Sequence, residues 1–333
     1  TPAAAVAQAM PGRVSKLVAD DDGSFMLNPA GRLTWRGDEV ARLARGRSLL
    51  SPEVEVLRNE LLDNAGREAV RQRLVAWLQR HLRKRLAPLF QATEAELGAP
   101  ARGIVFQLCE QLGSVPRRQV GSLVGTLSRE DRTALTEFGL RFGAFGVFFP
   151  SLLRPAAANL RAVLWRAHSG EDAAILDHPI ASPREKMAAS YPASGASEAC
   201  WDALGYAVLG SVALRYDRIE QLSARLYKAA RGGPFAETES LSALAGCSGA
   251  EFAIVVARLG FRSRQGKGET PPLFTPKRRP AKAGNKGNAK KDGKKAAAEA
   301  EKKKSRKKRN RRAAPAIDHA SPFAALKDLV IAK

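Results

Sequence analysis

Cysteine is scarce in this chain of 333 residues. The three that are present, Cys109, Cys200 and Cys247, are odd in number and far apart. A disulfide-stapled domain needs an even set of cysteines, and a structural zinc site needs ligands at short, regular spacing. The spacing therefore indicates neither a disulfide framework nor a zinc site, and it fits a reducing cytoplasm.

Long hydrophobic runs are also missing. No stretch reaches the roughly 18 apolar residues that a membrane-spanning helix needs. The first ten residues, "TPAAAVAQAM", have neither a basic leader nor an apolar core. The sequence therefore predicts a cytoplasmic protein without a membrane partner. The chain begins at Thr1 rather than at Met, which is compatible with a processed product or a fragment of a longer protein.

Nucleotide and hydrolase motifs are absent. The nearest approach to a Walker A loop, Gly260 to Gly268, has five residues between its first two glycines and a Gly after Lys267, where Ser or Thr is required. The string "GCSGA" has Ala250 where a nucleophile elbow requires Gly. The sequence gives no catalytic residue, and it leaves open whether the chain is an enzyme.

Metal-ligand patterns are missing as well. The four histidines form no HExxH motif and no pair at ligand spacing, and Asp20, Asp21 and Asp22 lack the alternate-position spacing of a calcium loop. We therefore assign no metal and no cofactor to this chain.

What the chain has in abundance is positive charge. The formal net charge is +22, and the segment from Ser263 to Lys333 holds 22 of the 55 Lys and Arg but only 6 of the 33 Asp and Glu. That segment therefore carries +16, and residues 1–262 carry only +6. Such a balance indicates a polyanionic partner, and nucleic acid is the most common one.

The N-terminal region is predicted to form short strands. Two brief apolar runs flank Gly37-Asp38 in "GRLTWRGDEVARL", which is typical of a β-hairpin. From Pro52 the pattern turns helical, and apolar residues recur at helical spacing from Val70 to Leu82. Arg73, Arg80 and Lys84 share another face of that helix. A phosphate-facing stripe is one interpretation, and a solvated face is the one we favour.

A compact helical block is predicted to follow. Ser128 and Asp131 have the spacing of a capping box, and Ser114 with Pro116 and Pro155 mark two further helix starts. Between them lies "GLRFGAFGVFFPSLLRP", residues 139–155. Its phenylalanines repeat every three to four residues, which predicts a buried helical stripe with a kink near 143–146 rather than a base-stacking platform.

The segment "ESLSALAGCSGAEFAIVVARLGF" (239–261) reads as helix, turn, helix, followed by a basic "RSRQGKGETPPLF". This spacing is that of a helix-turn-helix with a wing. A plain helical hairpin explains the apolar positions equally well.

The C-terminal tail cannot bury a core. From Pro276 onward the composition is mostly Lys, Arg, Ala, Gly and Asn, which predicts disorder. The last residues regain a pattern, because Ser321 and Pro322 can start a short amphipathic helix. That helix would dock on a partner or on the body of the protein through Phe323, Leu326 and Leu329.

Together these patterns predict a mainly α-helical protein with a small N-terminal β-hairpin part, a helical bundle, a helix-turn-helix or winged-helix-like part, and a disordered basic tail with a short terminal helix. The predicted segments are 1–50 (β-hairpin-containing entry), 51–174 (helical accessory domain), 175–275 (helix-turn-helix-like domain), 276–315 (basic tail) and 316–333 (terminal amphipathic helix).

The order of motifs carries a family resemblance. "LTWRGDEVARL", "RGIVFQLCEQLGSVPR", "GLRFGAFGVFFPSLLRPAAANLRAVLW", "LSALAGCSGAEFAIVVARLGF" and a basic tail ending in "SPFAALKDL" together resemble the C-terminal half of alphaproteobacterial superfamily 2 helicases. Those helicases are similar to the mitochondrial suppressor-of-var RNA helicase. Relatives tend to have Tyr-His where this chain has Phe145-Gly146, and Lys where it has Arg154.

The resemblance implies an accessory region that holds or guides a nucleic-acid strand, RNA more than DNA, beside an ATP-dependent motor. ATP and Mg²⁺ would belong to motor domains that this chain does not contain. A non-catalytic protein tethered by its tail to ribosomes or another RNA assembly is the alternative. A sequence-specific regulator that uses Cys247, Arg262, Arg264 and Lys267 at a groove is a third. The candidate nucleic-acid-binding residues are Arg141, Arg154, Arg262, Arg264, Lys267, Lys277, Arg278, Arg279, Lys302, Lys303, Lys304, Arg306, Lys307, Lys308, Arg309, Arg311 and Arg312.

Overall fold

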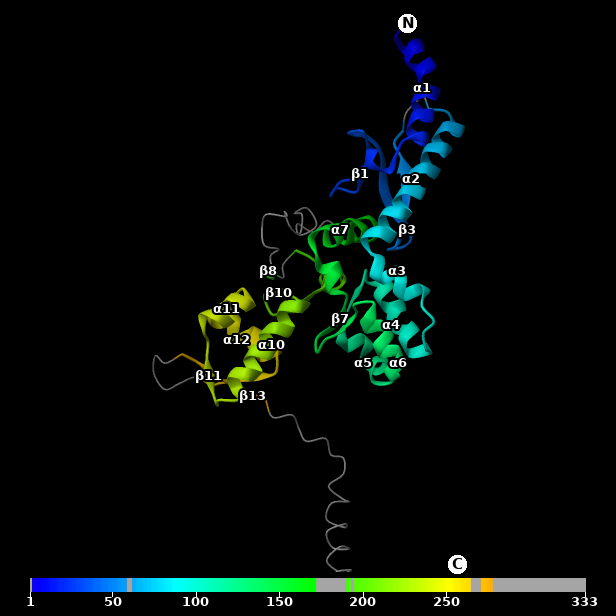
Figure 1. Ribbon diagram of the computed structural model, residues 1–333. Coiled ribbons are helices and arrows are strands. Elements are labelled where there is room, and N and C mark those ends of the chain that lie inside the picture. The colour runs from blue at the N-terminus through cyan, green and yellow to red at the C-terminus, as the bar shows by residue number, and fades with distance from the viewer. Residues whose placement is uncertain (1, 59–61, 172–189, 193–194, 265–270, 278–333) are drawn as a thin grey trace, which may run out of the picture. The chain divides into compact units, whose positions relative to one another are not determined.

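The computed structural model describes residues 2–58, 62–171, 190–192, 195–264 and 271–277 (Figure 1). Apart from its first two residues, Pro276 and Lys277, the predicted basic tail lies outside these residues, and so does the whole terminal helix with Phe323, Leu326 and Leu329. The described part is mainly helical with small antiparallel sheets, as the sequence predicts.

A four-stranded antiparallel meander forms the first sheet, in the order β1-β2-β3-β4. Arg36 and Gly37 have φ values of 51° and 94°, so the chain reverses there and confirms the predicted hairpin. Leu33 and Trp35 alternate with more exposed neighbours, which directs one face of β2 into the core. The strands are β1 (Phe25–Leu27), β2 (Arg32–Trp35), β3 (Asp38–Ser48) and β4 (Ser51–Val56).

Two helices pack beside this sheet, as Figure 1 shows in blue and cyan: α1 (Pro2–Ala19) and α2 (Asn64–Arg85). Asp63 caps α2 by accepting a hydrogen bond from the Gly66 N–H at 2.8 Å. The prediction of strands throughout residues 1–50 is wrong for α1, whose alanine-rich sequence has high helix propensity. The prediction that the helical region begins at Pro52 is also wrong, because "SPEVEV" alternates with a period of two and forms β4.

A helical block follows, and a break at Leu86 separates α2 from the next helix, which has Pro88 in its first turn. The Ser128 hydroxyl accepts from the Asp131 N–H at 2.9 Å, which confirms the predicted helix start. Ser114–Pro116, predicted as a helix start, is instead the short strand β5. The block contains α3 (Ala87–Glu94), α4 (Ala99–Glu110), α5 (Arg117–Gly125), α6 (Arg129–Glu137) and α7 (Pro155–Ser169).

Residues 139–155 are not a helical stripe. They form the strands β6 (Arg141–Phe142) and β7 (Gly146–Phe148), then the 3-10 turn η2 (Pro150–Leu153); β7 pairs with both β5 and β6. Burial is confirmed for Phe148, Phe149 and Leu152, whereas Phe142 and Phe145 are half-buried. Phe149 and Leu152 lie in the core shared with the N-terminal sheet and the helical block, whereas Phe148 and Leu153 lie in a second core farther along the chain. The alternating directions of side chains on a strand and turn make this segment the seam between two cores.

The second core belongs to α10, α11 and α12 and to strands of two three-stranded sheets, ordered β8-β10-β9 and β11-β13-β12. Trp201 and Leu204 of α9 pack instead with Ala158 and Ala162 of α7 in a third, smaller cluster. The predicted helix, turn and helix of residues 239–261 are confirmed as α11 and α12. The elements are β8 (Ser190–Pro192), α9 (Glu198–Leu204), β9 (Tyr206–Leu209), β10 (Val212–Arg215), α10 (Tyr216–Ala230), β11 (Phe235–Ala236), α11 (Glu239–Ala245), α12 (Gly249–Arg258), β12 (Phe261–Arg264) and β13 (Leu273–Pro276).

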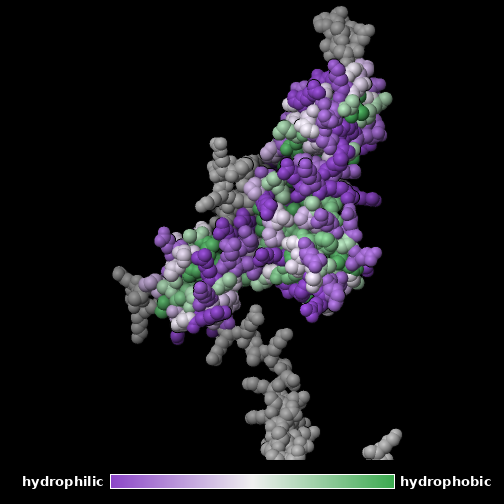
Figure 2. All heavy atoms as spheres, in the orientation of Figure 1, coloured by the Kyte–Doolittle hydropathy of each residue, from purple (hydrophilic) through white to green (hydrophobic). Residues whose placement is uncertain are grey.

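The surface is predominantly polar on the face drawn in Figure 2, where hydrophobic residues appear in scattered patches. Within the described ranges no single helix is long and apolar enough to cross a membrane; α11 and α12 pass that test of length and composition only as a pair, and the pair is bent by 71°.

Candidate nucleic-acid interface

The predicted basic residues of the described region lie at several separate places. Arg141 is exposed on β6, and Arg154 is exposed at the start of α7. Arg262 and Arg264 are exposed on β12, an edge strand. Lys277 donates from Nζ to the Ala257 carbonyl at 3.1 Å, so its ammonium group is held at the end of α12. The other candidates, Lys267, Arg278, Arg279 and the cluster from Lys302 to Arg312, lie outside the described residues.

The helix that would enter a groove, α12, is acidic at its N-terminal end, whereas its last turn carries the exposed Arg258. The Glu237 carboxylate accepts from the Gly249 N–H at 3.0 Å and so occupies the N-terminus of α12, where a phosphate would otherwise bind. Along its exposed side stand Glu251, which accepts from the Ser211 hydroxyl at 3.0 Å, and the apolar Ile254. The N-terminal end of α12 therefore gives no support to the interpretation of this chain as a sequence-specific regulator.

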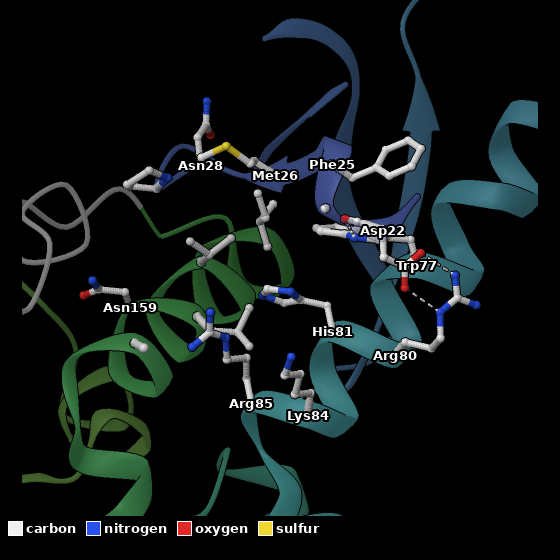
Figure 3. A pocket seen from close by; sticks show the side chains of 16 residues that line it. Asp22, Phe25, Met26, Asn28, Trp77, Arg80, His81, Lys84, Arg85 and Asn159 are labelled. Carbon is white, nitrogen blue, oxygen red and sulfur yellow. Dashed lines mark hydrogen bonds and ion pairs between the residues drawn. The ribbon is translucent and has the colours of Figure 1, made fainter. Parts of the chain in front are cut away.

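A more promising site lies between β1, α2 and α7. A pocket of about 590 Å³ opens there, and Figure 3 shows its side chains converging from the three elements. We call it the α2 pocket. It is lined by Asp22, Gly23, Phe25, Met26, Leu27, Asn28, Pro29, Trp77, Arg80, His81, Lys84, Arg85, Ala156, Asn159, Leu160 and Val163.

The floor of the α2 pocket is formed by two stacked rings on α2, those of Trp77 and His81. Trp77 is buried and donates from its indole N–H to the Asp22 carbonyl at 3.0 Å. The His81 imidazole stacks on Trp77 with ring centroids 5.0 Å apart and an interplanar angle of 26°. The spacing of four residues on one helix face accounts for this stack. Figure 3 shows His81 directed toward α7, across the middle of the pocket.

One wall of the pocket is an ion-pair cluster. The Asp22 carboxylate accepts from Arg80 through two bonds of 2.8 Å and from Arg73 at 2.9 Å. These arginines hold the pKa of Asp22 far below its usual range, with Arg80 contributing most. Arg73 and Arg80 are therefore neither a simple solvated face nor a free phosphate-binding stripe, because both of them fasten α2 to the turn before β1.

The opposite rim of the pocket carries two basic side chains that form no ion pair with a carboxylate among the described residues. Lys84 and Arg85, the basic pair, are exposed in the last turn of α2. Among the described residues neither of them forms an ion pair. Burial, and then the positive charge of Arg85 and Lys84, lower the pKa of His81 below its usual value of about 6.5. The pocket therefore holds a local excess of positive potential, which is what an anionic ligand requires.

Sequence patterns did not identify Met26, Arg85 or Asn159 as pocket residues, because the three lie on elements that are distant in the chain. They also missed Arg161 on α7, which is fully buried. Its guanidinium donates to the Leu152 carbonyl at 3.0 Å and also to the Ser114 hydroxyl and the Ala203 carbonyl. Burial lowers the pKa of Arg161 to about 10. A lone Arg inside the apolar string "AAANLRAVLW" was the available signal.

Comparisons with protein-family models, with curated proteins and with solved structures return no match to this chain. Among the described residues no group of three or more His, Cys, Asp or Glu side chains is arranged to hold a metal ion.

Proposed function

We propose that this chain is a nucleic-acid-binding accessory region of the kind that follows the motor of superfamily 2 RNA helicases. Its role is to hold a strand, RNA more than DNA, in the cytoplasm while motor domains outside this chain bind ATP and Mg²⁺. The single observation that carries the proposal is the α2 pocket, where apolar surface meets a basic pair that has no carboxylate partner within the described part of the chain. The net charge of +22 supports it.

The second half of the chain fits a supporting role in this function. We propose a winged-helix fold for residues 216–277, and the element order α10-β11-α11-α12-β12-β13 with the sheet order β11-β13-β12 supports that proposal. Since Glu237 occupies the N-terminus of α12, this domain acts as a packing module rather than as a reader of base sequence.

Strand binding by the full chain tests the proposal. We expect a fluorescent single-stranded RNA of about 20 nucleotides to bind with an affinity that falls steeply between about 50 and 200 mM salt, because phosphate contacts release counterions. Fluorescence anisotropy measures the affinity at each salt concentration. Failure to bind at the lowest salt would contradict the proposed function. A defined site returned by selection from randomised sequences would instead favour the regulator.

A further inference from the structure

The α2 pocket combines an apolar surface with a basic one. Met26 is 67% exposed at the mouth of the pocket, although it is a large apolar side chain, and Leu160 and Val163 line the side formed by α7. The basic pair stands on the rim at the end of α2. Apolar and aromatic surface suits the face of a nucleobase, and paired cations suit a phosphate.

We propose that the α2 pocket receives one unpaired nucleotide of a bound strand, with its base against Met26 and His81 and its phosphate on the basic pair. This inference rests on the proposed function and names the part of the strand that the folded region holds. Base identity is not selected, since stacking and apolar contact accept any base.

The size and shape of the pocket favour a single strand over a duplex. A volume of about 590 Å³ lies within the roughly 300–1,000 Å³ typical of small-molecule sites. A paired base cannot enter such a space without first leaving its helix, which adds the cost of unstacking. A nucleotide in an unpaired strand enters without that cost.

The location of the basic pair has a simpler explanation that the test must exclude. Cations in the last turn of a helix interact favourably with its dipole, and Arg83 in the same turn does so while it pairs with Glu94 at 2.7 Å. If that were the whole role of Lys84 and Arg85, replacing them would change helix stability but not ligand binding.

Methionine methyl NMR of the full chain gives a direct readout. The protein has three methionines, and among the described residues Met26 is the one that lines the α2 pocket. We expect uridine 5′-monophosphate to shift the Met26 methyl resonance in a saturable way, and the resonances of Met10 and Met187 to stay in place. The basic tail does not confuse this signal, since it contributes no methionine.

Matched variants then locate the site. Lys84→Gln with Arg85→Gln should raise the dissociation constant for the nucleotide at least about tenfold, since two charge-assisted contacts are lost. Arg45→Gln with Arg47→Gln removes the same charge from exposed positions on β3 outside the pocket and should leave the constant within about twofold. Circular dichroism is the control that checks whether both double variants are folded.

The possible failures differ from one another. An unmoved Met26 resonance, or equal effects of the two double variants, overturns the pocket inference even if RNA binds the chain. Inorganic phosphate that reproduces the whole effect of the nucleotide reduces the pocket to an anion site and also overturns it. Absence of RNA binding by the full chain overturns the proposed function, and the strand assignment with it.

Discussion

At the scale of single residues, His81 links pH to the α2 pocket. The pKa of His81 is lowered in the folded protein by burial and by the nearby Arg85 and Lys84. The unfolded chain therefore binds a proton here more readily than the folded chain does. The contribution of His81 to the free energy of unfolding is therefore present above about pH 6.5. It is lost as the pH falls through the lowered pKa that His81 has in the folded protein.

We expect His81→Gln to make the free energy of unfolding less dependent on pH between about pH 7 and 5. Urea denaturation at several pH values measures the effect, with wild type as the reference. A bound strand should raise the pKa of His81, because its phosphate offsets the neighbouring cations. An imidazole resonance that titrates above pH 6.5 in the free protein would contradict the prediction.

Arg161 gives the second prediction at this scale. Its guanidinium joins η2, β5 and the end of α9 through three acceptors, and all of them are enclosed in the core. Arg161→Met keeps much of the volume but removes the donor to all three acceptors. The Ala203 carbonyl keeps the Ser114 hydroxyl as a donor, whereas the buried Leu152 carbonyl loses its side-chain donor. We therefore expect a loss of about 2 kcal/mol in the free energy of unfolding. The exposed Arg154, at the N-cap position just before α7, is the control, and Arg154→Met should change that free energy by less than about 0.5 kcal/mol. Similar losses in both variants, measured by urea denaturation, would disprove the special role of Arg161.

At the scale of elements, the seam of residues 139–155 depends on two glycines. The Glu220 carboxylate accepts from the N–H groups of Ala144 and Phe145 at 2.7 and 3.2 Å and so fastens the turn between β6 and β7 to α10. A Cβ at Gly143 would collide with that carboxylate, and a Cβ at Gly146 would lie 2.8 Å from the Tyr216 ring. Close approach of α10 to the hairpin therefore requires glycine at both positions.

We expect Gly146→Ala to destabilise the protein by about 1–3 kcal/mol, because the Tyr216 ring is buried and cannot yield easily. Gly121→Ala in α5 is the matched change in open space, and it should stabilise by about 0.5–1 kcal/mol through helix propensity. Thermal unfolding of the two variants compares them. Equal midpoints would show that the hairpin moves away from α10 at little cost.

At the scale of the whole molecule, we expect the basic tail and the α2 pocket to make separable contributions to strand binding. Residues 278–312 contain 17 Lys and Arg and three Asp and Glu, a net charge of +14. Lys277 should be kept in a deletion, because its N–H donates to the Gly260 carbonyl at 2.8 Å at the end of the folded part.

Deleting residues 278–312 should weaken RNA binding at least about tenfold at 100 mM salt and flatten its salt dependence, because fewer counterions are released. Anisotropy titrations at several salt concentrations give the slope. The residual binding should then disappear in the variant that also carries Lys84→Gln and Arg85→Gln. An unchanged slope would contradict the role of the tail, and loss of all binding on deletion alone would favour the tethered interaction protein.

Local patterns predicted several elements well. The capping box at Ser128, the helix that starts at Pro155 and the turn between α11 and α12 all depend on residues close in sequence, and all three are confirmed. The prediction of a helical stripe for residues 139–155 was wrong, because apolar residues three to four positions apart also occur when a short strand is followed by a 3-10 turn. Whether such a segment becomes a helix or a strand and turn depends on its pairing partners, such as β5, which lies far away in the chain.

The sequence by itself determined the charge imbalance, the mainly helical class and the absence of the common catalytic motifs, since these follow from composition and local spacing. Only the tertiary structure decided that Arg73 and Arg80 are committed to Asp22, that Lys84 and Arg85 are not so committed, and that Met26 stands across from them. The physical reason is that ion pairing and pocket formation depend on which distant segments pack together. Core packing of β1, α2 and α7, not any local pattern, brings these residues to one place.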